Sequence, residues 1–188
     1  MLETVGELGY TQTSVEDVIR RGHFTRNGFY RCFTSKEQCF EAAYRCETER
    51  LLSAILEPCR SGVDWTSGLI DALGTALDFV AEHPLRAQAL LSVGQGAEDD
   101  MAAVQQQLFE RLTRALDSAR RLPGSRHSAP PLTAPLMIGA IENVMRGLLV
   151  SGESVRAPSL LADLTYLIVQ SYFDDEVAFA AMDAAKAR

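Results

Sequence analysis

The sequence of 188 residues lacks the features that identify membrane proteins, secreted proteins and proteins with paired cysteine motifs. It has no run of about 18 uncharged apolar residues, so we expect no helix that crosses a membrane. Its first residues lack the basic segment and apolar stretch of a signal peptide, and its four cysteines lack paired C-x-x-C spacing. We therefore expect a cytoplasmic chain with reduced thiols and no membrane partner.

Catalytic and metal-binding motifs are also missing. The three histidines, His23, His83 and His127, are scattered, and none has an H-x-x-x-H or carboxylate companion at ligand spacing. The sequence has no G-x-S-x-G, no P-loop and no dinucleotide fingerprint. We therefore predict that the protein is not an enzyme and holds neither a metal ion nor a cofactor.

Acidic residues are missing from one stretch of an otherwise acidic chain. The formal net charge is −7 and the pI is near 5.0, yet residues 18–36 contain no carboxylate. The cations of this stretch are Arg20, Arg21, Arg26, Arg31 and Lys36. A surface that meets a polyanion should carry no acid, so the pattern agrees with nucleic-acid binding; taken alone, it agrees equally with an ordinary solvated helix face. Phe29 and Phe33, which lie among the cations, are expected to be core residues.

The rest of the sequence has the periodicity of helices. Apolar residues recur at steps of three and four, and no convincing strand pattern with a period of two is present. The periodicity predicts long helices at about 35–56, 65–82, 97–121, 136–151 and 158–173, with Pro58 closing the first of them and Pro84 opening a short one. Residues 122–135, rich in proline, should form an irregular connection. We therefore predict an all-α chain, whose tail from Asp174 either frays or continues as helix.

Shorter helices with clear start signals are predicted in the first fifty residues. The sequence TSVE at residues 13–16 fits a capping box that opens a helix to about Arg21. Thr25 is a suitable N-cap for a second short helix, which ends near Phe33. Two short helices joined by a tight turn, with a third helix beneath them, predict a helix-turn-helix at residues 14–33.

In such a unit the N-terminal end of the second helix enters the major groove of DNA. Arginine can bind guanine through two hydrogen bonds, asparagine can bind adenine, and threonine can contact phosphate or a thymine methyl. The candidates for base contact are Thr25, Arg26, Asn27 and Gly28. The candidates for phosphate contact are Tyr30, Arg31 and Lys36, the last of which lies at a helix start where the dipole favours an anion.

The segment GYTQTSVEDVIRRGHFTRNGFYRCFTSKEQCFEA, residues 9–42, resembles the DNA-binding module of the TetR (tetracycline-repressor) family of transcription regulators. The matching positions are Gly9, Tyr10, Thr13, Val15, Val18, Thr25, Arg26, Phe29, Tyr30, Phe33, Ser35, Lys36, Glu37 and Phe40. We include Thr13 among the candidate DNA contacts. The resemblance implies a helix-turn-helix DNA-binding domain at residues 1–46 and a helical ligand-binding and dimerisation domain at residues 47–188. It also implies a homodimeric repressor.

Two features depart from the family pattern. Where the family turn usually reads Ala-Gly-Val, this chain has Gly22-His23-Phe24, and histidine tolerates a positive φ better than most residues. Only residues 2–8 precede Gly9, so we expect the first helix to be truncated relative to the family and to lack its basic arm.

The last two long helices have the composition of an interface. The sequence LMIGAIENVMRGLLV is apolar on nearly all sides, and a helix that is apolar on more than one face needs more than one partner. The resemblance implies a dimer interface of four helices. The candidate contacts are Gly139, Asn143, Gly147, Leu164 and Ile168. The alternative is a helical hairpin that is buried within one domain.

We expect a ligand pocket between the middle helices. The sequence gives only candidate residues for its lining. These are Trp65, Phe79, Met101, Leu108, Phe109, Glu142 and Arg146. Apolar residues at helical spacing more often form plain core than a pocket. Glu142 and Arg146 are four residues apart on one helix, so they could bind a polar ligand group or pair with each other.

The favoured hypothesis is a ligand-responsive transcriptional regulator, a repressor that a small-molecule effector releases from a palindromic operator in double-stranded DNA. The competing hypothesis is a helical ligand-binding or protein-interaction module of the same fold that no longer binds DNA. A minority hypothesis is redox sensing through Cys32, which lies on the second helix of the helix-turn-helix.

Overall fold

The computed structural model describes residues 1–60, 64–92, 99–126 and 129–188 of the chain. Over these residues the protein consists of ten α-helices and two 3-10 helices, with no strand, so the prediction of an all-α chain is confirmed. The helices are α1 (Leu2–Leu8), α2 (Val15–Gly22), α3 (Arg26–Cys32), α4 (Lys36–Arg60), α5 (Trp65–Glu82), α6 (Pro84–Ser92), α7 (Asp99–Asp117), η1 (Ser118–Arg121), α8 (Thr133–Val150), η2 (Ser154–Leu160), α9 (Leu161–Tyr172) and α10 (Asp175–Lys186).

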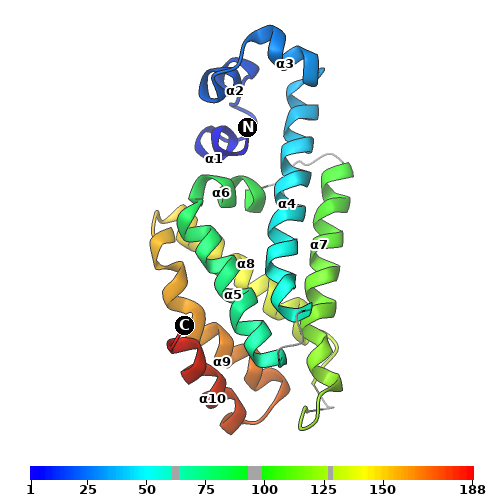
Figure 1. Ribbon diagram of the computed structural model, residues 1–188, viewed down its shortest axis with the longest axis vertical. Helices are drawn as coiled ribbons and strands as arrows, with labels where there is room; N and C mark the ends of the chain where they lie inside the picture. Colours follow the sequence, from blue (N-terminus) through cyan, green and yellow to red (C-terminus); the bar gives the residue numbers. More distant parts are fainter. Residues whose placement is uncertain (61–63, 93–98, 127–128) are drawn as a thin grey trace.

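The three short helices α1, α2 and α3 form a small module at one end of an elongated molecule (Figure 1). From α3 the chain enters α4, which runs down into the larger helical body and packs there against α5 and α7. Because α4 is continuous from Lys36 to Arg60, the small module and the body share one helix.

The end of α4 differs from the prediction. The helix continues through Pro58 to Arg60, so the expectation that Pro58 closes it is wrong. Pro58 lies in the last turn of α4, where its missing N–H removes one hydrogen bond within the helix. This turn packs closely against Gly68 of α5. A Cβ atom added to Gly68 would lie 3.5 Å from both the Cα of Cys59 and the carbonyl oxygen of Pro58.

Prolines mark helix starts elsewhere in the body. α5 ends at Glu82 and α6 opens at Pro84, as predicted, because the residue before a proline avoids the α region. α8 begins at Thr133, two residues ahead of Pro135, although the sequence placed both residues in an irregular connection. A proline in the first turn lacks an N–H group that would have no partner inside the helix in any case.

The tail of the chain continues as helix. Asp174 caps α10, and its carboxylate accepts a hydrogen bond of 3.1 Å from the backbone amide of Val177. Alanines on one face, Ala178, Ala181 and Ala185, are buried against the rest of the body. Their small side chains let α10 lie close to α9, with which it makes its main contact.

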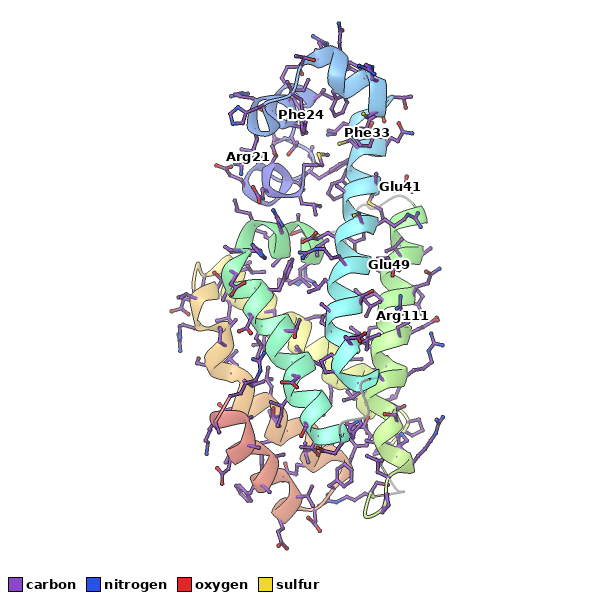
Figure 2. All side chains as sticks on the ribbon, in the orientation of Figure 1. Arg21, Phe24, Phe33, Glu41, Glu49 and Arg111 are labelled. Atoms are coloured by element: carbon purple, nitrogen blue, oxygen red, sulfur yellow. The ribbon has the colours of Figure 1, made fainter. Side chains whose placement is uncertain are left out.

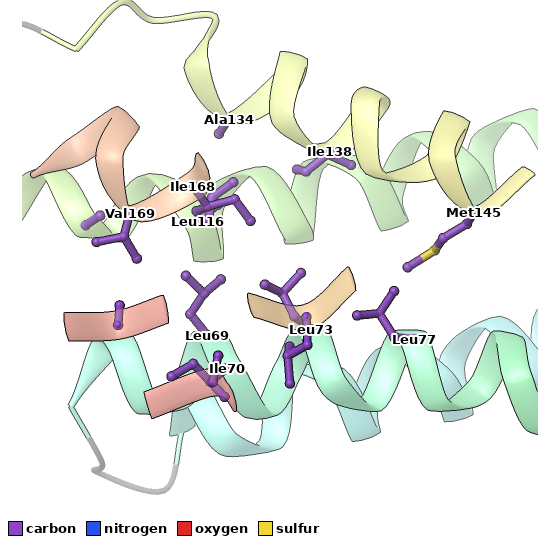
Figure 3. Packing of buried hydrophobic residues seen from close by; sticks show 14 of the residues in the cluster. Leu69, Ile70, Leu73, Leu77, Leu116, Ala134, Ile138, Met145, Ile168 and Val169 are labelled. Atoms are coloured by element: carbon purple, nitrogen blue, oxygen red, sulfur yellow. The ribbon is translucent and has the colours of Figure 1, made fainter. Parts of the chain in front are cut away.

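One apolar cluster, shared mainly by α5, α8, α9 and α10, forms the core of the body. Figure 3 shows Leu73 and Leu77 of α5 on one side of this core and Ile138 and Met145 of α8 on the other. Burial of each large apolar side chain contributes about 1.5–3 kcal/mol. Ile168 of α9 is 1% exposed and belongs to this cluster, so its predicted place in a dimer interface is wrong.

A second apolar cluster joins α1 to the upper end of the body. Its buried members are Leu2, Val5, Phe40, Tyr44, Ala89, Met101 and Val104, which come from α1, α4, α6 and α7. At the centre of this contact, a Cβ atom added to Gly6 of α1 would overlap the backbone carbonyl of Leu85 in α6. Only glycine fits at this position without a shift of the backbone.

Tyr172 ties α9 to the end of α7. Its side chain is fully buried, and its hydroxyl donates a hydrogen bond of 2.8 Å to Oδ1 of Asp117. Nε of Arg120 donates to the same oxygen at 2.9 Å, and its guanidinium lies 5.5 Å from the centroid of the Tyr172 ring. Burial, together with the Asp117 carboxylate, raises the pKa of the Tyr172 phenol, so this hydroxyl remains a donor at neutral pH.

We expect Tyr172→Phe to lower the free energy of unfolding by about 1–3 kcal/mol, because it removes a buried hydrogen bond to a charged group and keeps the packing of the ring. Chemical denaturation followed by circular dichroism measures the change. Tyr166→Phe is the matched control, since the described residues give the Tyr166 ring a partner in Phe179 but its hydroxyl no hydrogen bond. Equal stability of the two variants would contradict the assignment.

Candidate nucleic-acid interface and ligand cavity

A capping box at Ser14 starts α2. Ser14 Oγ accepts a hydrogen bond of 3.2 Å from the amide of Asp17, and Asp17 Oδ2 accepts one of 3.0 Å from the amide of Ser14. Hydrogen bonds from the Ser14 hydroxyl and amide hold the pKa of the Asp17 carboxyl below its usual range. The predicted box of Thr13 and Glu16 is therefore wrong by one residue. Thr13 is buried and donates its hydroxyl to the Gly9 carbonyl at 2.8 Å, so it is not placed to contact DNA.

His23 makes the turn between α2 and α3. Its backbone is left-handed, with φ 54° and ψ 34°, in agreement with the expectation that histidine supplies a positive φ here. The amides of His23 and Phe24 donate to the carbonyls of Arg20 and Ile19 at 3.4 and 3.1 Å. The Phe24 side chain is 65% exposed. The turn therefore leaves the side chains of His23 and Phe24 exposed to solvent, and Figure 2 shows Phe24 in the small module of α1, α2 and α3.

A cap and one buried face hold α3 in place. Thr25 Oγ1 accepts a hydrogen bond of 3.0 Å from the amide of Gly28, as the predicted N-cap requires. Phe29 is buried, and its ring centroid lies 5.7 Å from that of Phe33, which packs against the same small cluster. These two aromatic residues are therefore core, as expected. The exposed side chains of α3 include Arg26, Asn27, Tyr30 and Arg31, four of the candidate DNA contacts.

Neighbouring helices supply the carboxylates that residues 18–36 lack. Arg26 Nη1 lies 3.3 Å from Glu16 of α2. Arg21 forms an ion pair with Glu7 of α1 and lies 3.7 Å from Glu3. The stretch is thus free of acid in sequence but not in space. Because these pairs are exposed, each contributes only about 0–1 kcal/mol, and a phosphate group could replace the carboxylate.

The remaining cations of α3 and α4 differ in their surroundings. Lys36 Nζ donates to the carbonyl oxygen of Tyr10 at 3.1 Å and lies 4.3 Å from the centroid of the Tyr10 ring. Lys36 is therefore held against the loop that follows α1. Arg31 is exposed, and it belongs to none of the ion pairs formed by the described residues. Of the two, Arg31 is the more accessible to a phosphate group.

We expect His23→Gly to raise the free energy of unfolding by up to about 1 kcal/mol, because glycine adopts a positive φ with no steric penalty. His23→Val, which introduces a β-branched side chain at the same φ, should lower it by more than about 1 kcal/mol. Thermal unfolding of the two variants beside the parent chain measures both effects. A valine variant as stable as the parent would show that the turn does not require this conformation.

A cavity of about 540 Å³ lies in the body among α4, α5, α6, α7 and α8. Six of the predicted pocket residues line it: Trp65, Phe79, Leu108, Phe109, Glu142 and Arg146. Met101 does not, because it packs in the cluster beneath α1.

At the outer edge of the body, α4 and α7 are bridged by Glu49 and Arg111, whose oxygen and nitrogen atoms are 3.1 Å apart (Figure 2).

The lining of the cavity is mostly apolar, with a group of polar side chains around Tyr44. The Tyr44 hydroxyl interacts with Thr48 of the same helix and with Gln105 of α7. Burial raises the pKa of the Tyr44 phenol, the Glu142 carboxylate adds to the rise, and the two hydrogen-bond partners oppose it. The sequence analysis did not predict this group. The available signal was the spacing of four residues between Tyr44 and Thr48 on a helix.

Glu142 and Arg146 do not form an ion pair with each other. Nη1 of Arg146 instead donates to the carbonyl oxygen of Leu91, in the last turn of α6. Burial raises the pKa of the Glu142 carboxyl, and the charge of Arg146 offsets part of that rise. Glu142 therefore lines the cavity as a half-buried acceptor.

α8 turns an apolar face to solvent. The exposed residues on this helix include Leu136, Gly139, Ala140, Asn143, Val144, Gly147 and Val150, at steps of three and four. Gly139 and Gly147 have open space around their Cβ positions, while Leu164 of α9 is half-buried. By length and composition alone α8 would also suit a membrane span, and 28% of it is buried within the chain.

Comparison with known families gives a match for the small module. Residues 2–43 match the family model described as bacterial regulatory proteins, tetR family. The match covers α1, α2, α3 and the start of α4, the helices that carry the candidate DNA contacts. No curated protein matches the chain in sequence.

Solved structures share the fold over nearly the whole chain. FadR from Bacillus subtilis, in complex with stearoyl-CoA, superposes with a TM-score of 0.79 at 13% identity, over 90% of this chain and 94% of that one. SmeT, the repressor of the Stenotrophomonas maltophilia multidrug efflux pump SmeDEF, gives 0.73 at 19% identity, over 93% and 87%. A TetR-like transcriptional regulator from Rhodococcus sp. RHA1 gives 0.71 at 21% identity, over 90% and 89%. At these identities the likeness shows the fold.

Proposed function

We propose that this chain, whose residues 2–43 match the model of the tetR family of bacterial regulatory proteins, is a ligand-responsive repressor of transcription that binds a palindromic DNA operator as a homodimer. The observation that carries the proposal is the start of α3, which Thr25 caps and which exposes Arg26 and Asn27. Arginine and asparagine are the side chains that bind guanine and adenine edges most specifically.

In this proposal α3 lies in the major groove of DNA. Arg26 and Asn27 contact base edges, while Tyr30 and Arg31 contact the phosphate backbone. Arg26 is held by Glu16 and lies 5.9 Å from the centroid of the Tyr30 ring, so its guanidinium is partly oriented before DNA binds. Binding then requires that a base or a phosphate replace the Glu16 carboxylate.

The exposed face of α8 supports a homodimer. A contiguous apolar face on a soluble chain usually marks a protein interface. Asn143 lies in the middle of this face, where an amide suits a protein partner better than hydrocarbon, because it needs hydrogen-bond partners. A second copy related by two-fold symmetry would place two α3 helices in successive major grooves, about 34 Å apart.

α6 connects the cavity to the DNA-binding module. Its Leu91 lines the cavity, and the backbone of its Leu85 lies against Gly6 of α1. Nε of Arg86, also in α6, donates to Glu3 of α1 at 3.0 Å. A ligand that moves α6 therefore moves α1, and release of DNA follows as a shift between two arrangements of the small module.

The ligand role of the cavity has support in proteins of the same fold. FadR was solved with stearoyl-CoA, and SmeT was solved with triclosan. The cavity of this chain is within the size range of about 300–1,000 Å³ that is usual for small-molecule sites. We therefore assign it as the effector site.

We expect Arg31→Gln to weaken binding to a short DNA duplex of arbitrary sequence and to reduce the slope of log K against log salt by about 0.9, the value for one lost phosphate contact. Glu16→Gln should strengthen binding, because it removes the carboxylate beside Arg26. Fluorescence anisotropy at several salt concentrations measures both changes. Arg156→Gln, in η2 of the body, is the matched control for the loss of one exposed arginine.

The outcomes separate the two hypotheses about this chain. If the parent chain binds no duplex at low salt, the competing hypothesis of a module that no longer binds DNA is favoured. If Arg31→Gln and Arg156→Gln have the same slope as the parent, DNA binds elsewhere on the surface.

The α1–α6 contact gives a second prediction. We expect Gly6→Ala to increase hydrogen exchange in α1 and to weaken duplex binding, because the added methyl group collides with the Leu85 carbonyl. Exchange in α9 should not change. Gly68→Ala is the matched control, since its Cβ would meet neighbours at ordinary distances of 3.5 Å and beyond. Unchanged exchange in α1 of the Gly6 variant would refute the proposed connection.

A further inference from the structure

The cavity has one polar end and one apolar end. About 22 Å of helix rise separates Tyr44 from Cys59, which both line it from α4. Thr48, Gln105 and Glu142 line the cavity with Tyr44; the first two form hydrogen bonds with its hydroxyl, and the charge of Glu142 acts on it. Near Cys59 the lining is apolar and includes Trp65, Leu69, Leu112 and Leu116. A ligand that fills this space is long, with a polar group at one end.

The two charged side chains at the polar end do not form an ion pair with each other. Among the described residues that line the cavity, Glu142 is the only carboxylate and Arg146 the only cation. Arg146 is engaged with the Leu91 carbonyl at the end of α6, where the helix dipole also favours a positive charge. Glu142 forms no ion pair with a described residue, and burial raises the pKa of its carboxyl. A carboxylate in such a place is costly unless a cation joins it.

We propose that the cavity binds an elongated apolar amine, with its ammonium group at Glu142 and its apolar body extended along α4 toward Trp65. This inference rests on the proposed function, in which the cavity is the effector site. An ammonium group donates up to three hydrogen bonds. Besides Glu142, the residues Tyr44, Thr48 and Gln105 line this end of the cavity, and each carries an oxygen atom that can accept a hydrogen bond.

Other head groups suit the site less well. A carboxylate would lie beside Glu142 in a medium of low dielectric constant, where like charges repel strongly. Arg146 offsets part of the Glu142 charge from its place at the Leu91 carbonyl, but it forms no ion pair with Glu142. An alcohol can form a hydrogen bond with Glu142 but gains no ionic attraction. We therefore expect affinity to fall in the order amine, alcohol, carboxylate for ligands with the same chain.

The single tryptophan of the protein, Trp65, lines the apolar end and reports occupation of the cavity by its fluorescence. The full-length protein is titrated with decylamine, decanol and decanoate at physiological salt, below the concentrations at which they form micelles. We expect decylamine to bind about ten- to a hundredfold more tightly than decanol, the gain from a hydrogen bond to a charged group. Decanoate should bind most weakly.

Two variants test whether the Glu142 carboxylate causes the preference for decylamine. Glu142→Gln should abolish the preference for decylamine over decanol, while continued binding of decanol shows that the cavity is intact. Glu153→Gln removes an exposed carboxylate that pairs with Arg156 outside the cavity. It should leave all three affinities unchanged, which controls for general attraction of amines to an acidic protein.

Tighter binding of decanoate than of decylamine, or an amine preference that survives in Glu142→Gln, overturns the proposal and leaves the cavity as an effector site for another class of ligand. Binding of none of the three compounds overturns it as well. The proposed function fails separately if decylamine binds as expected but does not change the affinity of the protein for a DNA duplex.

Discussion

At Gly6 the backbone of α1 passes so close to that of Leu85 in α6 that no side chain fits between them. This contact fixes how the DNA-binding module sits on the body, because α1 packs on α6 and also shares an apolar cluster with α4 and α7. The ion pair between Arg86 and Glu3 closes the contact at its edge. α6 in turn lines the cavity and, at Leu91, accepts a hydrogen bond from Arg146 of α8. A change in the shape of the cavity therefore reaches the helix-turn-helix through a short chain of packed backbone.

The DNA-binding module and the cavity differ in how their charged side chains are paired. At the DNA end the arginines are held by carboxylates from neighbouring helices, in exposed pairs that a phosphate group can displace at little free-energy cost. In the cavity, Glu142 lies in a mostly apolar space and forms no ion pair with a described residue, and the charge of Arg146 offsets only part of the effect of its burial. The first arrangement suits a partner that is a polyanion, and the second suits a ligand that brings a positive charge.

Local chemistry made much of the fold predictable from the sequence. The N-cap at Thr25, the break at His83 and Pro84 and the positive φ of His23 all depend on a few adjacent residues. Some local details were still wrong, such as the residue that starts the capping box of α2. Other errors arose where packing across the fold decides the outcome. Periodicity shows that α9 is apolar on more than one face, but it does not show that Ile168 faces the core of its own chain. Likewise, an acid-free stretch does not show that Glu7 and Glu16 lie beside it in space.

The DNA-binding surface of α3 was easier to predict from the sequence than the polar end of the cavity. The exposed residues of α3 follow from one short helix with one buried face, so sequence spacing sufficed to find Arg26 and Asn27. The polar end of the cavity is built from α4, α7 and α8, so no local pattern brings Tyr44, Gln105 and Glu142 together. The engagement of Arg146 with Leu91, in place of Glu142, likewise depends on where α6 ends.

The central claim is that two copies of α3 read one operator, and selection of bound sequences from a pool of randomised duplexes tests it most directly. The account predicts that the purified protein enriches an inverted repeat, with half-site centres about one helical turn, or 34 Å, apart. It also predicts that alteration of one half-site weakens binding. Enrichment of no sequence, or of a site without two-fold symmetry, would contradict it.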